Sequence, residues 1–242
     1  MAEKMAIEPD WQGAIEKVRP YVVRIRTPSG SGTGFLFAYS SQLCGVATAA
    51  HVVDYAYWWE LPIRVDHHSS GETTMLRHGQ RAILINKLHD SAALIFPRGQ
   101  LPFPPDLLEL VPEGKFLRVG NPIGWLGFPA VSPDDLCFFL GTASCWQELQ
   151  HSYLVDGVAI NGVSGGPAFG AFGDSPLLVG AMTAYMPNRA TGETLPGLSI
   201  VRDLKHAQEV VRQLRNLDEA KEKETAEEPA EPPASLNESG GT

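Results

Sequence analysis

The sequence has few cysteines, few charged residues and no long apolar run. Its 242 residues include three cysteines, Cys44, Cys137 and Cys145, which form no Cys-x-x-Cys pair and no cluster with histidine, so a zinc site is not expected. A low, odd count indicates a reducing compartment. No stretch approaches the roughly 20 apolar residues of a membrane span, and residues 1–13 lack the apolar run of a signal peptide. We therefore expect a cytoplasmic protein, or a periplasmic or secreted one if a leader was removed.

Basic residues are also scarce. The sequence has 19 lysines and arginines and 28 acidic residues, which gives a net charge of −9. Neither a nucleic acid nor an anionic membrane is therefore an expected partner. The segment from Asp218 to Thr242 alone carries −6 and almost no large apolar residue. Such a segment cannot bury enough surface to offset its ordering entropy, and we predict a disordered acidic tail over 218–242.

Glycine and proline are abundant instead, at 24 and 19 residues. This composition favours many short strands joined by tight turns. Two runs of about six strands, at residues 20–100 and 113–203, flank a proline-rich crossover at 97–112, and the pattern includes a strand over 57–65. This arrangement fits two β-barrels or one large sandwich. Apolar residues spaced by three and four predict a closing helix over 204–217.

Three short segments carry residues with catalytic chemistry, although each also has a plain structural interpretation. His51 follows a run of small residues, as many structural histidines do, and Asp90 opens an apolar strand, where a turn residue is common. Ser164 lies in Asn161-Gly-Val-Ser-Gly-Gly-Pro, whose glycines allow a backbone that turns N–H groups toward one point. Together they give the order His, Asp, Ser, one of the known chain orders of a serine-protease triad.

These segments give the chain its resemblance to a known family. Thr48-Ala-Ala-His51-Val, Asp90-Ser-Ala-Ala-Leu and Gly162-Val-Ser164-Gly-Gly-Pro resemble the His, Asp and Ser segments of trypsin-like serine proteases, closest to the bacterial Deg/HtrA branch. Ser31-Gly-Thr-Gly-Phe and Val119-Gly-Asn-Pro-Ile-Gly also resemble segments of that branch. The resemblance covers residues 15–211. It implies an all-β fold of two six-stranded antiparallel barrels with a C-terminal helix, and one protease domain over 1–217 without a PDZ domain.

The resemblance also implies a mechanism. Ser164 would attack a peptide carbonyl, His51 would take its proton, and Asp90 would orient His51, with the N–H groups of Gly162 and Ser164 as the oxyanion hole. A shift of the alignment by one residue would put Ser91 in the place of Asp90. No cofactor or metal is implied. Protein or peptide substrates are the expected partners, and a homo-oligomer is possible.

The primary specificity pocket follows from the same resemblance. Its base would lie six residues before the nucleophile, at Val158, and one wall would follow Thr183, Ala184 and Tyr185. Because Val158 carries no charge, small or medium apolar residues should fit better than Lys or Arg.

Two other functions remain open. One is a catalytically silent protein-binding module on a protease fold. The other is a metal protein built on His67, His68 and His78, although adjacent strand residues point to opposite faces. The remaining histidines, His89, His151 and His206, are expected to be ordinary polar residues.

Overall fold

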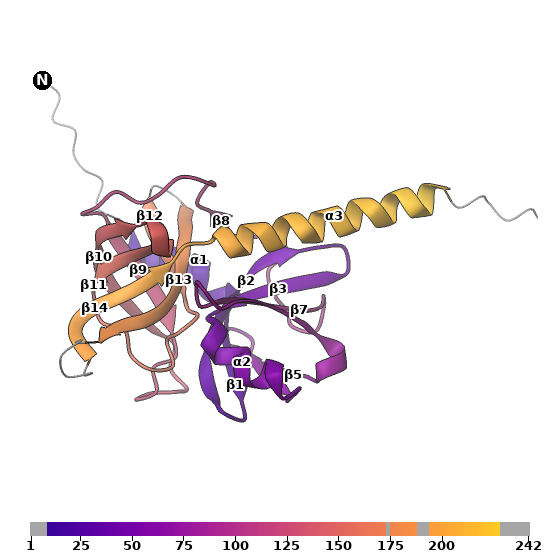
Figure 1. Cartoon of the computed structure of the whole chain (residues 1–242), viewed down its shortest axis with the longest axis horizontal. Coiled ribbons are helices and arrows are strands. Elements are labelled where there is room, and N and C mark those ends of the chain that lie inside the picture. Colours follow the sequence, from indigo (N-terminus) through magenta and orange to yellow (C-terminus); the bar gives the residue numbers. More distant parts are fainter. Residues whose placement is uncertain (1–8, 173–174, 188–193, 228–242) are drawn as a thin grey trace, which may run out of the picture.

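The structure, a computed structural model, describes residues 9–172, 175–187 and 194–227. It consists of two seven-stranded sheets and three α-helices (Figure 1). The first sheet contains β1 (Val22–Thr27), β2 (Gly30–Tyr39), β3 (Leu43–Thr48), β4 (Ile63–His67), β5 (Thr73–Leu76), β6 (Ala82–Asn86) and β7 (Ser91–Pro97). The second contains β8 (Glu109–Leu110), β9 (Pro122–Gly127), β10 (Cys137–Gln147), β11 (Ser152–Asp156), β12 (Pro167–Phe172), β13 (Ser175–Pro187) and β14 (Thr194–Arg202).

The strands of the first sheet follow the order β5-β4-β1-β2-β3-β7-β6, and every neighbouring pair is antiparallel. Its interior is filled by side chains from most of these strands, including the fully buried Ile25, Leu36 and Leu94. β3 and β7 are buried almost along their whole lengths, as their continuous apolar runs predict. The ends of these two strands lead to His51 and Asp90, so a rigid core carries both residues.

The second sheet closes on itself. Its order is β12-β9-β10-β11-β14-β13-β8, and β12 also pairs with β13, which makes a ring of six antiparallel strands. β8 lies outside the ring, parallel to β13. The expected barrel-like, all-β architecture is therefore confirmed. The count of six holds for the closed ring, whereas the first sheet has seven strands and the second gains a short parallel edge strand from the proline-rich crossover.

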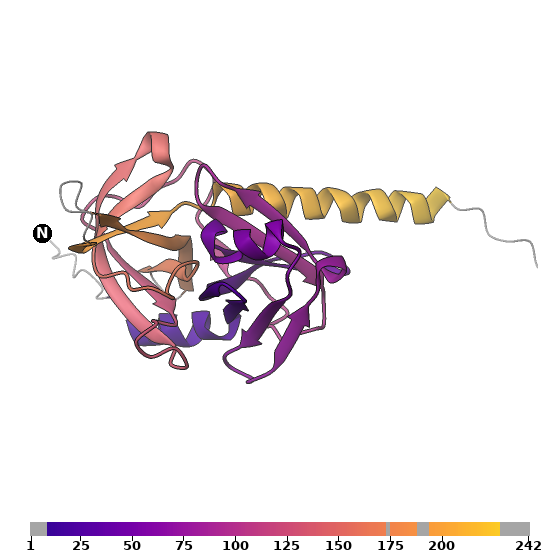
Figure 2. The same ribbon diagram turned by 60° about the horizontal axis from the view of Figure 1, so that its bottom comes forward.

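The two terminal helices each pack across the boundary between the barrels. α1 (Trp11–Val18) begins at Asp10, whose carboxylate accepts the N–H of Gly13, and its Trp11 ring contacts Phe138 and Phe169 of the second barrel. α3 (Lys205–Glu227) follows the last strand of the second barrel but lies along the first (Figure 2). Together they cover a hydrophobic core that lies between the barrels and contains residues of both, and this core fixes the barrels relative to each other.

α3 is longer than the sequence predicts. It continues to Glu227, so residues 218–227 are helical and the predicted boundary of the disordered tail at 218 is wrong. Asp218 accepts hydrogen bonds of 2.7 Å from both the N–H and the hydroxyl of Ser41, and Lys221 donates to Gln42 at 2.8 Å. These contacts attach the last turns of α3, beyond the predicted end of the helix at 217, to the turn after β2. Residues 228–242 lie outside the described residues. Among the described helices, none has the length and apolarity needed to cross a membrane.

Candidate active site

His51 and Asp90 come from two different elements of the first barrel. His51 lies in the first turn of α2 (Ala50–Trp58), and Asp90 lies in the turn between β6 and β7. His51 Nδ1 is 2.8 Å from Asp90 Oδ2, and Asp90 Oδ1 accepts the backbone N–H of His51 at 3.0 Å. The carboxylate thus contacts both the ring and the backbone of the histidine, which fixes the ring orientation and leaves Nε2 available.

The turn that carries Asp90 is held from both sides. Asp90 has φ 47°, a left-handed conformation that aspartate tolerates better than most residues. Its carbonyl accepts the N–H of Ala50 at 3.2 Å. The Ser91 hydroxyl lies 3.0 Å from His206 Nδ1 on α3, and the His89 ring meets the His151 ring at 5.1 Å. The sequence left open whether Asp90 or Ser91 is the partner of His51. In the structure Asp90 contacts His51, whereas Ser91 contacts His206 of α3.

The pKa of His51 is raised above its ordinary value of 6.5. The main cause is the hydrogen bond to Asp90, whose carboxylate stabilises the protonated ring, while partial burial works in the opposite direction. The side chain remains half exposed and Asp90 is 28% exposed, so the pair is accessible from solvent. A histidine in this setting is a stronger base than a free one.

Ser164 lies in a loop whose path depends on glycine at two positions. Gly162 and Gly165 have φ of 92° and 85°, where only glycine is free of strain. A Cβ at Gly162 would clash with the carbonyl oxygen of Phe128, and one at Gly165 with that of Thr33. The loop therefore runs directly against the backbone of both barrels, which brings a second-barrel serine to the edge of the first barrel.

Ser164 and His51 line one cavity of about 300 Å³, together with Ala159, Ile160, Asn161, Met182 and Thr183. The Ser164 hydroxyl donates to the carbonyl of Thr183 at 3.2 Å. Within the described ranges no hydrogen bond joins Ser164 to His51. Such hydrogen bonds are often long or poorly aligned in the absence of substrate and tighten only when it binds, so the structure without substrate does not rule this one out.

The peptide groups beside Ser164 are oriented by their carbonyls. The carbonyl of Asn161 accepts the N–H of Ala130 at 2.6 Å, and that of Val163 accepts the N–H of Gly166 at 2.9 Å. In a trans peptide the N–H points opposite to the carbonyl, so the N–H groups of Gly162 and Ser164 are turned away from these partners. Neither N–H donates to an acceptor in the described part of the chain. Two backbone donors without an acceptor among the described residues thus lie side by side in the loop, one of them on the serine itself.

The predicted specificity residues lie at different places around the cavity. Thr183 lines it, and its carbonyl holds the serine hydroxyl. Val158 is 53% exposed and does not line the cavity, whose neighbouring wall consists of the next three residues. The backbones of Ala184 and Tyr185 continue β13 and pair with β14, while their side chains lie outside the described residues.

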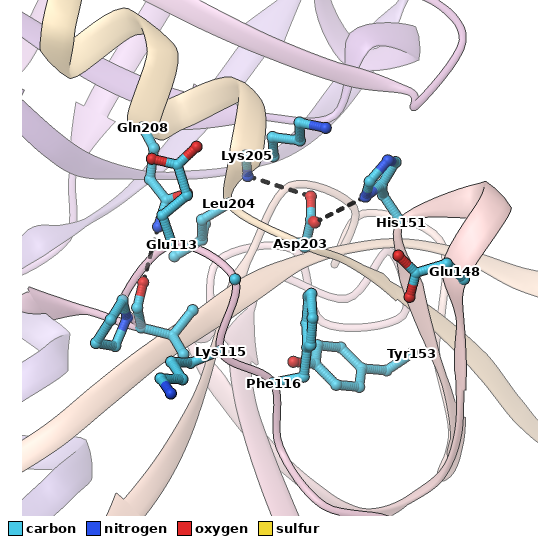
Figure 3. A pocket seen from close by; sticks show the side chains of 13 residues that line it. Glu113, Lys115, Phe116, Glu148, His151, Tyr153, Asp203, Leu204, Lys205 and Gln208 are labelled. Atoms are coloured by element: carbon cyan, nitrogen blue, oxygen red, sulfur yellow. Dashed lines mark hydrogen bonds and ion pairs between the residues drawn. The ribbon is translucent and has the colours of Figure 1, made fainter.

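A second cavity, of about 320 Å³, lies between β11, residues 111–116 and the start of α3 (Figure 3). In it Asp203 faces His151, with Asp203 Oδ2 3.4 Å from His151 Nδ1, and Asp203 Oδ1 accepts the N–H of Lys205. None of the predicted site residues lines this cavity. It adjoins the turn that carries Asp90 only indirectly, because His151 also contacts His89. The sequence contained no signal that would group these histidines, which are far apart in the chain.

The histidines considered as metal ligands do not converge. His67 is buried, with Nδ1 2.8 Å from the Ser70 hydroxyl and Nε2 2.8 Å from the Pro20 carbonyl, so both ring nitrogens are engaged. The His68 ring packs on Phe128, and His78 is exposed beside Glu60. Among the residues that the structure describes, no group of three or more metal-ligating side chains gathers.

The fold defined by these barrels is that of the chymotrypsin-like serine proteases. Among solved structures, the chain is similar to the serine endoprotease from Yersinia pestis, with a TM-score of 0.63 and 19% sequence identity over 86% of this chain and 68% of that one. No family model matches the sequence, and no curated protein matches it. The chain therefore has a protease fold, and its chemistry must be argued from its own residues.

Proposed function

We propose that the chain is a serine endopeptidase in which Ser164 is the nucleophile, His51 the general base and Asp90 the residue that orients the base. The observation that carries this proposal is the 2.8 Å contact between His51 Nδ1 and Asp90 Oδ2, with Ser164 in the cavity that His51 lines. A serine hydroxyl is a weak nucleophile unless a base takes its proton, and this arrangement provides one.

The chemistry follows from the hydrogen bonds. With its Nδ1 proton directed to Asp90, neutral His51 accepts the Ser164 proton at Nε2 as Oγ attacks the substrate carbonyl. The N–H groups of Gly162 and Ser164 receive the negative charge on the carbonyl oxygen. The protonated His51 then donates to the leaving amine, and water hydrolyses the acyl-enzyme by the same steps.

The alternative is a catalytically silent protein-binding module on the same fold. The hydrogen bond from Ser164 to the Thr183 carbonyl favours it, because that bond directs the hydroxyl away from the base. A fluorophosphonate probe separates the two functions, since it reacts only with an activated serine. We expect labelling of the wild type and of Ser144→Ala, which removes an exposed serine of the second barrel, but not of Ser164→Ala or His51→Ala. An unlabelled wild type would support the binding module.

The cavity also supports a preference for small or medium apolar residues before the cleaved bond. Ala159, Ile160 and Met182 give it a neutral lining, so a Lys or Arg side chain would lose water without gaining a charged partner. We expect peptides with Val, Ala or Leu at that position to be cleaved about 100-fold faster than those with Lys or Arg.

Two aspartate variants test which residue limits the cavity. Ile160→Asp should weaken cleavage after apolar residues, because Ile160 lines the cavity. Val158→Asp should have a smaller effect if its exposed position holds when substrate binds, and an equal or larger effect if Val158 forms the base. A peptide-library profile dominated by Lys or Arg would contradict the proposed preference.

A further inference from the structure

Thr33 of β2 joins the serine loop to both barrels. It is completely buried, and it lies just beyond the point where β3 stops pairing with β2. The edge of β2 that β3 leaves free is taken by the loop, because the N–H of Thr33 donates to the carbonyl of Ser164 at 2.8 Å. A strand of the first barrel thus binds the backbone of the second barrel's candidate nucleophile.

The side chain of Thr33 makes a second and separate contact with the loop. Its hydroxyl donates to the carbonyl of Gly162 at 2.9 Å and accepts the N–H of Phe128 at 3.0 Å. A threonine hydroxyl has one proton to donate, and here it goes to the loop. The Thr33 carbonyl in turn accepts the hydroxyl of Thr48, three residues before His51.

These bonds fix the peptide group that lies between the two unused N–H donors. Gly162 contributes the carbonyl that Thr33 holds, and the N–H of the same peptide, from Val163, donates to the carbonyl of Ile160 at 3.1 Å. With both ends of the 162–163 peptide held, it cannot rotate without losing two hydrogen bonds. A rotation there would turn the neighbouring N–H groups out of their arrangement around Ser164.

We infer that Thr33 is a positioning residue for the oxyanion site. It does not touch the reacting atoms; its hydroxyl holds the loop in the conformation that places the Gly162 and Ser164 N–H groups. The inference rests on the proposed function for its catalytic consequence, while the loop conformation itself can be measured without any activity. A misplacement of about 1 Å in such a site can reduce the rate about 100-fold.

The test compares Thr33→Val, which has the shape of threonine without the hydroxyl, with Thr33→Ser, which keeps it. Ser152→Ala is the matched control, because Ser152 is also completely buried and its hydroxyl donates to Gln147, outside the described site. For Thr33→Val we expect kcat to fall about 10- to 100-fold with KM changed less than about threefold. Thr33→Ser and Ser152→Ala should retain kcat within about threefold of the wild type.

Hydrogen–deuterium exchange over residues 160–167 supplies the readout that needs no activity. The amides of Val163 and Gly166 donate within this region and that of Gly165 donates to Met182, so all three report on the order of the loop. We expect faster exchange there in Thr33→Val only. Thr33→Ala replaces Thr33→Val if that variant does not fold. Unchanged exchange and kcat in Thr33→Val, or equal losses in the Val and Ser variants, would overturn the inference. If the wild type neither cleaves nor labels, the proposed function fails while the exchange comparison still decides the role of Thr33.

Discussion

The first barrel supplies a histidine and an aspartate that are already hydrogen-bonded, whereas the second supplies a serine whose hydroxyl is bound within its own barrel. His51 and Asp90 share two hydrogen bonds, and the bond of Ser164 goes to Thr183. His51 lies at the start of α2 and Asp90 in a tight turn, and both elements pack on the core of the first barrel, which determines the geometry of the pair. Ser164 and His51 are not hydrogen-bonded in the described ranges, and a bond between them would cross the barrel boundary, where Thr33 contacts the serine loop.

The largest effects should follow from removing Ser164 or His51, which lie on opposite sides of the barrel boundary. Ser164→Ala and His51→Ala are each expected to lower kcat about 10⁶-fold, and the double variant should lose no more than either single one, because the residues act as a unit. The measurement is peptide hydrolysis with circular dichroism as the control for folding. Wild-type turnover in either folded variant would show that the residue is misassigned.

Removing the charge of Asp90 should lower activity less than removing Ser164 or His51. Asp90→Asn keeps a residue that tolerates the left-handed conformation but removes the charge that orients His51, and we expect kcat to fall about 10⁴-fold. Ser91→Ala removes only the contact with His206 and should cost far less activity. A large loss for Ser91→Ala with none for Asp90→Asn would move the site by one residue.

The pH dependence reports on the hydrogen-bonded pair directly. The pKa of His51 is raised by Asp90, so the fall in kcat/KM toward acid should begin above the ordinary histidine value of 6.5, and the rate should drop about tenfold per pH unit below it. Asp90→Asn should move this limb to lower pH. A limb at or below 6.5 in the wild type would mean that the pair does not form in solution.

The same raised pKa gives stability the opposite pH dependence. The protonated pair stabilises the folded chain fully below the unfolded value of about 6.5, and this contribution is lost as the pH rises through the higher folded pKa. Activity and this part of the stability should therefore change in opposite directions across the same pH range. Thermal melts of the wild type and His51→Ala, compared over that range, measure the effect.

Shortening α3 should have the smallest effects. Removing residues 228–242 should leave the melting temperature and peptide hydrolysis unchanged. Removing residues 218–242 also deletes the contacts of Asp218 and Lys221 with the turn after β2, and should lower the melting temperature by less than about 5 °C. A larger fall would mean that the end of α3 contributes substantially to holding the first barrel.

Secondary structure near the candidate site differs from the sequence prediction in one segment. The sequence indicates a strand over 57–65, yet the structure has α2 through Trp58 and a strand that begins at Ile63. The aromatic and apolar residues there suit either element locally. The buried face of α2, formed by Val52, Val53 and Ala56 packed on the first barrel's core, selects the helix, and tertiary packing of this kind commonly overrides local propensity.

The residue types at the candidate site, the glycines that the serine loop requires and the all-β class could all be predicted from the sequence. Those features depend on chemistry and backbone freedom that belong to single residues and short motifs. The three-dimensional packing of the chain was needed to show that Asp90 contacts His51 and that Ser91 does not. It was also needed to show that the serine hydroxyl donates to Thr183 and that Thr33 binds the loop. These contacts join residues 19 to 129 positions apart, and their geometry is set by packing within and between the barrels, which no local pattern encodes.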